Sequence, residues 1–275
     1  MGLATGVNRI YHDLVFSRGI AMPRLLVTGL SGLIGTALRE SFPAQYELSA
    51  LNRSDVSGVP TTRASLDDQS VIRPAFDGQD AVVHLAAKIN DSYGWDDLHA
   101  TNVVGTRNVL EAARDAGVKR VVFTSSGATV AGWELLEPYK SIIAGDYGQV
   151  PDRWQMIDET MATRPRNLYA ATKVWGEAIA RHYADNHGLE IVCLRIGYAN
   201  HADRPEDARQ FSVWNSRRDV VNAIRLALEI DLPQKYDVFF ILSDNRWSYR
   251  NIEHANKVLG YVPMDVAEDY REIDD

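Results

Sequence analysis

Residues 24–35 read Arg24-Leu-Leu-Val-Thr28-Gly29-Leu-Ser-Gly32-Leu-Ile-Gly35, and this stretch decides the fold. Residues 24–28 form a short apolar run of the kind that makes a buried parallel strand. A GxxGxxG spacing follows, and residues 36–41 are suited to a helix. Glycines permit a tight turn and let backbone N–H groups approach a pyrophosphate at a helix N-terminus. The order of strand, glycine loop and helix therefore favours a dinucleotide-binding unit over a turn that serves only close packing.

Apolar runs alternate with helical spacing along the rest of the chain. Strands are predicted at 46–51, 80–87, 119–126, 190–196 and 236–242, and helices at 70–76, 95–116, 169–186, 219–230 and 251–259. This alternation predicts an α/β fold with a doubly wound parallel (Rossmann) sheet and a small C-terminal substrate-binding lobe. We expect an N-terminal extension (1–22), a dinucleotide-binding core (23–200) with an inserted substrate loop (133–165), and a small substrate lobe and tail (201–275).

Three features follow the carboxyl ends of predicted parallel strands and therefore lie at one edge of the predicted sheet. These are the glycine loop, the Ala86-Ala87 pair and the Ser125-Ser126 pair. Ligands of such folds bind at this edge. Small alanines let a cofactor lie against the backbone. His84, at the end of its run, is predicted to pack rather than to catalyse. Asn102 is predicted to bridge backbone groups and to order a water near the site.

Tyr169 and Lys173 lie four residues apart, so a helix places them on one face. A neighbouring ammonium favours the phenolate and lowers a tyrosine pKa from its usual value of about 10. Such a phenol can take a proton from an alcohol. A motif with only two fixed residues is weak evidence on its own, and it is also compatible with an ordinary surface tyrosine and lysine. The features at the sheet edge favour the catalytic interpretation.

The end of the second predicted strand bears on the choice between NAD and NADP. In NAD-binding folds an acidic residue about 20 residues after the glycines holds the ribose 2′-OH. Here the strand ends in Asn52-Arg53-Ser54, and Asp55 comes late. Arg53 is placed to meet a 2′-phosphate, which favours NADP over NAD.

Charge and composition limit the partners. A net charge of -8 and a pI near 5.4 argue against nucleic acid or an anionic membrane as the main partner. No apolar run is long enough to span a bilayer, and residues 1–22 lack a signal-peptide core. Cys193 is the single cysteine, so an internal disulfide is excluded, and no spacing predicts a metal site. We expect a cytoplasmic protein that binds a small molecule.

The motifs in this order resemble the extended short-chain dehydrogenase/reductases, the NAD-dependent epimerase/dehydratase group. They are TGxxGxxG at 28–35, HLAA at 84–87, NxxGT at 102–106, the serine pair at 125–126 and YxxxK at 169–173. The compact C-terminal region looks most like that of the uronate and related sugar dehydrogenases. The resemblance implies a homodimer built from the helices at 102–116 and 169–186.

The resemblance also implies roles for individual residues. Tyr169 would be the acid/base, Lys173 its electrostatic partner and a ligand of the nicotinamide ribose, and Ser126 a hydrogen-bond donor to the reacting oxygen. The cofactor site would comprise Gly29, Ser31, Gly32, Leu33, Ile34, Gly35, Asn52, Arg53, Ser65, Leu66, Leu85, Ala86, Ala87, Asn102, Tyr169, Lys173 and Ile196. The substrate site would comprise Ser125, Ser126, Gly127, Arg195, Ser216 and Arg217.

Departures from the family pattern leave three functions open. Gly127-Ala128 stand where uronate dehydrogenases have an Asn-His pair that touches the sugar and dehydratases an Asp-Glu pair, and Ser65 stands in place of an adenine-contacting Asp. We favour an NAD(P)-dependent oxidoreductase acting on a sugar-like or other secondary alcohol. A nucleotide-sugar epimerase with tightly bound NAD is the alternative; the Arg217-Arg218 pair supports it and the short C-terminal region opposes it. A non-catalytic dinucleotide sensor fits least, because Ser126, Tyr169 and Lys173 are all present.

Overall fold

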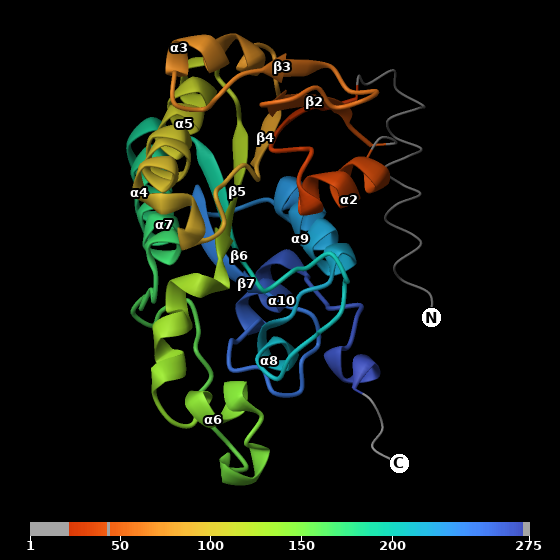
Figure 1. Cartoon of the computed structure of the whole chain (residues 1–275). Helices are drawn as coiled ribbons and strands as arrows, with labels where there is room; N and C mark the ends of the chain where they lie inside the picture. Colours follow the sequence, from red (N-terminus) through yellow and green to blue (C-terminus); the bar gives the residue numbers. More distant parts are fainter. Residues whose placement is uncertain (1–21, 43–44, 272–275) are drawn as a thin grey trace.

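The computed structural model describes residues 22–42 and 45–271, and its centre is a parallel sheet (Figure 1). Seven strands lie in the order β3-β2-β1-β4-β5-β6-β7. They are β1 (Arg24–Thr28), β2 (Glu47–Asn52), β3 (Thr61–Arg63), β4 (Ala81–His84), β5 (Arg120–Ser126), β6 (Glu190–Ile196) and β7 (Tyr236–Ile241). The crossover between β3 and β4 reverses the direction of strand addition beside β1, which is where a doubly wound sheet opens its ligand site. The predicted α/β Rossmann class is confirmed.

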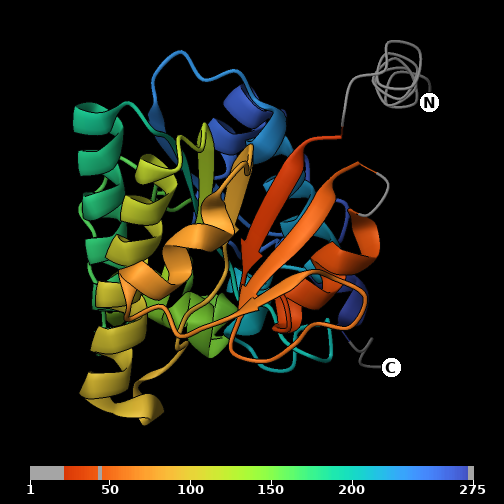
Figure 2. The ribbon, with the colours of Figure 1, turned by 90° about the horizontal axis from the view of Figure 1, so that it is seen from above.

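Helices cover both faces of the sheet (Figure 2). One layer contains α2 (Leu33–Ser41), α9 (Arg217–Glu229) and α10 (Glu253–Leu259), and the other contains α3 (Gln69–Ile72), α5 (Gly105–Asp115) and α7 (Leu168–His187). Side chains alternate along β1, so Leu25 and Val27 join the first core cluster while Leu26 joins the second. Both faces of the central strands are therefore buried, as their continuous apolar sequences require.

The segment 133–165 folds against the C-terminal part of the chain. It contains α6 (Tyr139–Ala144), and Ile157 forms a β-bridge with Arg250. A third apolar cluster joins Tyr139 and Ile157 to Phe240 and other residues of the C-terminal part, which also contains the short helix α8 (Gln210–Val213). Figure 1 shows this segment below the carboxyl ends of the strands. The inserted segment thus lies beyond the carboxyl ends of the strands, packed against the C-terminal part of the chain.

The helix predicted at 95–116 is interrupted. Helix α4 (Gly94–Leu98) continues into a π-helical stretch, His99–Val104, before α5 begins. Wide turns of this kind often occur at functional sites. Helix α7 matches its predicted span closely: Asn167 caps its start, and Gly188 ends it in the left-handed conformation with φ of 70°.

The predicted N-terminal extension falls almost entirely on residues 1–21, which lie outside the described residues. Within 22–42 and 45–271, no helix is long and apolar enough to cross a membrane. The same residues contain no group of three or more His, Cys, Asp or Glu side chains that could hold a metal ion.

Candidate active site

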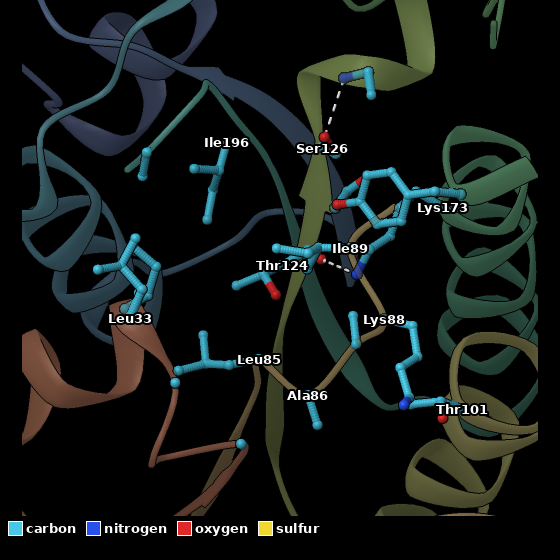
Figure 3. A pocket seen from close by; sticks show the side chains of 18 of the residues that line it. Leu33, Leu85, Ala86, Lys88, Ile89, Thr101, Thr124, Ser126, Lys173 and Ile196 are labelled. Atoms are coloured by element: carbon cyan, nitrogen blue, oxygen red, sulfur yellow. Dashed lines mark hydrogen bonds between the residues drawn. The ribbon is translucent and has the colours of Figure 1, made fainter. Parts of the chain in front are cut away.

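A cavity of ≈ 1140 Å³ opens at the carboxyl ends of the central strands (Figure 3). Strands β1, β2, β4, β5 and β6 deliver residues to it: Gly29 follows β1, Asn52 ends β2, Leu85 follows β4, Ser126 ends β5 and Ile196 ends β6. Most of the predicted cofactor residues line it, namely Gly29, Ser31, Gly32, Leu33, Ile34, Gly35, Asn52, Arg53, Ser65, Leu66, Leu85, Ala86, Ala87, Tyr169, Lys173 and Ile196. The shared strand polarity of the sheet brings these distant segments together.

The glycine loop has the geometry that a dinucleotide needs. Gly29 has φ of +75°, and a Cβ there would lie 2.8 Å from the Cα of Ala86. A Cβ at Gly35 would lie 2.5 Å from the Leu30 carbonyl oxygen, so α2 can start close to β1 only with glycine at this position. Gly32 is the N-cap residue of α2, and no side chain caps the start of this helix. The first N–H groups of this helix are therefore suited to bind a pyrophosphate.

Ser31, Asn52 and Arg53 form the end of the cavity at which the adenosine part of a cofactor was predicted to bind. The Asn52 amide donates to the Ser31 hydroxyl at 3.1 Å and to the Ser54 carbonyl at 2.8 Å, which fixes the turn after β2. Arg53 is exposed beside it. Asp55, the late acid, forms an ion pair with Arg63 at 3.6 Å and does not line the cavity. This end therefore presents a cation and no carboxylate.

Helix α7 is held so that Tyr169 faces the cavity. The Asp91 carboxylate accepts hydrogen bonds from the backbone N–H groups of Leu168 at 3.1 Å and Tyr169 at 2.8 Å. Deeper along the helix, a Cβ at Gly176 would lie 2.5 Å from the ring of Phe123. Because Gly176 has no side chain, α7 packs tightly on β5 and brings Lys173 up to the strand end.

Ser126, Tyr169 and Lys173 meet at the end of β5. The Ser126 hydroxyl is hydrogen-bonded to the Tyr169 phenol, and its oxygen also accepts from the Ala128 N–H at 3.1 Å. The Lys173 ammonium donates to the Thr124 carbonyl at 2.8 Å (Figure 3) and lies 6.0 Å from the centre of the Tyr169 ring. The three predicted catalytic residues thus share one wall of the cavity.

The protonation of this group differs from expectation. Burial raises the pKa of Tyr169, and the Ser126 hydrogen bond opposes the rise only in part. Burial also lowers the pKa of Lys173 to about 8, although Glu177 works the other way. A lowered pKa was predicted for Tyr169 beside Lys173, whereas the pKa is raised in this structure. Desolvation outweighs the lysine, whose ammonium is bound to Thr124 instead.

His84 and Asn102 are structural supports of the cavity. The His84 ring hydrogen-bonds to Thr28 at 2.7 Å and Thr106 at 3.1 Å, and burial lowers its pKa to about 3, so the predicted packing role is confirmed. Asn102 donates to the Lys88 carbonyl at 2.9 Å and accepts from the Lys88 N–H at 2.8 Å. It bridges backbone groups as expected but does not line the cavity, so its placement in the cofactor site is corrected. Lys88 and Thr101 line the cavity there instead.

Four predicted substrate residues lie away from the cavity lining. Arg195 is buried near the carboxyl end of β6, where its Nε and Nη2 donate to Glu177 at 2.9 and 2.8 Å. The Ser216 hydroxyl accepts from the Asp219 N–H at 3.0 Å as the cap of α9 and donates to Asp265 at 2.6 Å. Arg217 forms an ion pair with Asp203 at 3.1 Å, beside a separate hollow.

Those three side chains are bound to partners within the protein and do not line the cavity. Gly127 contributes no lining either, because the Arg250 guanidinium lies against it. Ser125 does line the cavity, although its hydroxyl donates to Glu177 at 2.5 Å. Of the predicted substrate residues, Ser125 and Ser126 remain in the cavity wall.

A charged wall of the cavity was missed from the sequence. It consists of Glu134, Arg166, Arg209 and Arg250. These residues belong to separate stretches without a recognisable motif. The one local signal is Glu134 itself, a single acid inside the apolar run 128–136.

Residues 25–217 match the sequence profile described as the NAD dependent epimerase/dehydratase family. The chain belongs to this family. It is 30% identical to an L-arabinose 1-dehydrogenase (NAD(P)(+)) from Haloferax volcanii over 89% of this chain and 97% of the relative. It is 31% identical to an NAD-dependent glucose-6-phosphate dehydrogenase from the same organism over 90% and 95%, respectively.

A solved structure is similar as well. A variant of the uronate dehydrogenase from Agrobacterium tumefaciens in complex with NAD superposes with a TM-score of 0.77 at 29% identity. The superposition covers 91% of this chain and 88% of the other. The family member described here is an NAD(P)-dependent oxidoreductase of the short-chain dehydrogenase/reductase type.

Proposed function

We propose that the protein oxidises or reduces a sugar-like secondary alcohol or its carbonyl form, with Tyr169 as the acid/base. The observation that carries the proposal is the position of Ser126, Tyr169 and Lys173 in the cavity that also holds the glycine loop. Relatives named for L-arabinose, glucose 6-phosphate and uronate share a sugar as substrate. This common feature supports a sugar-like substrate for this chain.

The proton chemistry follows from the contacts of the three side chains. Bound nicotinamide supplies the hydride acceptor or donor. Tyr169, as phenolate, takes the proton of the substrate hydroxyl. The Ser126 oxygen accepts from the Ala128 N–H, and its O–H, which is hydrogen-bonded to Tyr169 before substrate binds, would donate to the reacting oxygen. The buried Lys173 ammonium, 6.0 Å from the phenol ring, favours the charged form of the tyrosine.

Turnover of a sugar panel tests this function. Purified protein is mixed with NAD⁺ or NADP⁺ and with aldoses, their acids and their phosphates, and reduced-nicotinamide absorbance is followed. We expect absorbance to rise with at least one sugar. Cofactor binding without turnover on any sugar, alcohol or carbonyl would favour the sensor, and epimerised product with retained NAD would favour the epimerase.

The feature that favoured an epimerase has another explanation. Arg217 and Arg218 were candidate diphosphate ligands, but Arg217 pairs with Asp203 and Arg218 with Asp265. Both arginines border the separate hollow between α2 and α9 rather than the cavity. The dehydrogenase is therefore the proposal that the described residues support.

We also propose a preference for NADP, supported by exposed Arg53 in the cavity wall. Arg53→Ala should raise KM for NADP by about 10–100-fold, since a hydrogen bond to a charged group contributes about 1.5–3 kcal/mol. KM for NAD should change little. Steady-state kinetics with both cofactors measures the difference.

Arg63→Ala is the matched control, because Arg63 is a nearby exposed arginine that does not line the cavity. It should leave both KM values unchanged. Equal effects of Arg53→Ala on the two cofactors would show that Arg53 does not contact the 2′-phosphate.

Alcohol oxidation should accelerate as pH rises. Because burial raises the pKa of Tyr169, the phenolate is scarce at neutral pH, and its fraction grows about tenfold per pH unit below the pKa. The reverse reduction uses the phenol, so it should stay level through neutral pH and fall only when the tyrosine ionises. Profiles of kcat/KM against pH in both directions measure this.

Lys173→Met gives a control for that profile. Without the ammonium the phenolate is less favoured, so the rise should move to higher pH. An oxidation profile that is flat from neutral pH upward would contradict Tyr169 as the titrating base.

We further propose a homodimer built from the helices at 102–116 and 169–186. The support is family resemblance, together with exposed apolar side chains at Trp95 and Leu168 near the starts of these helices. Light scattering on the purified protein measures the mass and decides between a monomer and a dimer.

A further inference from the structure

The charged wall of the cavity is organised around one buried acid. Glu134 has 1% of its side chain exposed, although it borders the cavity that contains Ser126 and Tyr169. Arg166, Arg209 and Arg250 point their guanidinium groups at this carboxylate. Burial acts to raise the pKa of Glu134, but Arg209 and Arg250 outweigh it and keep the pKa below its usual value. The wall therefore carries a charged, internal carboxylate.

Of the three arginines, Arg209 makes the most hydrogen bonds to this carboxylate. Its Nε donates to Oε2 at 3.0 Å and its Nη2 donates to Oε1 at 2.7 Å. This is the two-pronged geometry by which arginine recognises carboxylate and phosphate groups. Asp207 adds a second negative charge beside Arg209. The side of the guanidinium that an anionic ligand would use is thus already occupied.

Two further contacts lock Glu134 in place. The Tyr249 hydroxyl donates to Oε1 at 2.5 Å, and Arg250 Nη2 lies 3.7 Å from the same oxygen. Arg250 can enter the wall because residue 127 is a glycine: a Cβ there would lie 2.1 Å from Nη1 of Arg250. Gly127, which does not touch the cavity itself, therefore acts through Arg250.

We propose that Glu134 is a specificity-determining residue that occupies Arg209, so that this wall selects an uncharged, hydroxyl-bearing substrate group over a carboxylate or phosphate. An incoming anion would have to displace Glu134 and leave a desolvated carboxylate without its main partner, which is strongly unfavourable. Glu134 acts through Arg209 and is a positioning residue. The inference rests on the proposed function and names the substrate class: neutral sugars rather than sugar acids or sugar phosphates.

The opposite outcome would be that the charged wall of the wild-type protein binds an anion. Three guanidinium groups face Glu134, so a second anion could be attracted by the remaining positive charge. Arg166 is the arginine with most freedom, because its side chain is 43% exposed and its contact with Glu134 is 3.4 Å long. An experiment on anion binding separates the two cases.

Inorganic phosphate is titrated into cofactor-saturated protein while the thermal unfolding midpoint is measured. Saturating cofactor keeps phosphate out of the pyrophosphate site at the glycine loop. The wild type should show no saturable shift. Glu134→Gln should gain one, since Arg209 is released, and the double variant Glu134→Gln, Arg209→Met should lose it again.

Saturable phosphate binding by the wild type that Arg209→Met abolishes would overturn the proposal, because the wall would then be an anion subsite. If Glu134→Gln does not fold, this comparison of the wild type with Arg209→Met still decides the question. The titration needs no turnover. A chain that is inert toward all alcohols would therefore refute the proposed function without affecting this result.

Kinetics with D-galactose and D-galacturonate, which differ only at C6 (a hydroxymethyl group in the first and a carboxylate in the second), gives the second readout. The wild type should have the higher kcat/KM for the neutral sugar. Glu134→Gln should shift the ratio toward the acid by about tenfold or more through KM, as expected for a freed arginine–carboxylate contact. Glu134→Asp, which keeps the charge, should retain the neutral preference, whereas a purely structural defect would reduce kcat for both sugars alike.

Discussion

Tyr169→Phe is expected to lower kcat by about 10²–10⁴-fold, the usual contribution of a positioned acid/base. The substitution removes only the phenol oxygen that is hydrogen-bonded to Ser126. The ring and the capped start of α7 should remain, because Asp91 and Asn167 bind backbone N–H groups rather than the phenol. Cofactor affinity should therefore change little. Turnover is measured on the best substrate of the sugar panel, and affinity by fluorescence titration.

Tyr147→Phe is a suitable control for this variant. Its hydroxyl accepts only a peripheral hydrogen bond from Arg271 and does not border the cavity. It should retain wild-type turnover. Near-normal turnover of Tyr169→Phe with intact folding would remove Tyr169 from the acid/base role, whatever the glycine loop binds.

Arg195→Met is expected to destabilise the protein by about 3–5 kcal/mol, the usual cost of leaving one partner of a buried ion pair uncompensated. The side chains of Arg195 and Glu177 are 5% and 8% exposed and share two hydrogen bonds. The orphaned Glu177 would keep only a hydrogen bond from Ser125 among these partners. Denaturant unfolding of the cofactor-free protein measures the loss.

Lys257→Met gives the matched comparison on the surface. Lys257 pairs with Glu253 one helical turn away, and both side chains are well exposed. Breaking this pair should change the free energy of unfolding by less than about 1 kcal/mol. If Arg195→Met cost no more than this but raised KM for the substrate, the original assignment of Arg195 to the substrate site would have to be restored.

The residues proposed for catalysis and cofactor binding are visible in the sequence because local structure constrains them. Gly29 must tolerate φ of +75° and a close approach to Ala86, so only glycine fits, and the pattern is visible in the sequence. Tyr169 and Lys173 are visible because helical periodicity places them on one face. Strand polarity then predicts that these features meet at one sheet edge, and they line one cavity in the structure.

The charged wall of the cavity was not predictable in the same way. Glu134, Arg209 and Arg250 are far apart in the chain, and no periodicity links them. Arg195 was assigned to the substrate site by family resemblance, yet it forms an ion pair with Glu177 from α7, a contact that depends on helix-to-sheet packing. Likewise, the pKa of Tyr169 is raised because of burial, which a sequence does not report.

The sequence alone determined the fold class, the dinucleotide cradle and the Ser126–Tyr169–Lys173 group, since backbone sterics and helical and strand periodicity act over a few residues. Only the tertiary structure decided which charges pair. Coulombic attraction and desolvation act between side chains that folding brings together from separate segments. Those pairings bury Arg195 against Glu177 and assemble Glu134 with Arg209 and Arg250, and they determine which parts of the cavity wall remain for a substrate.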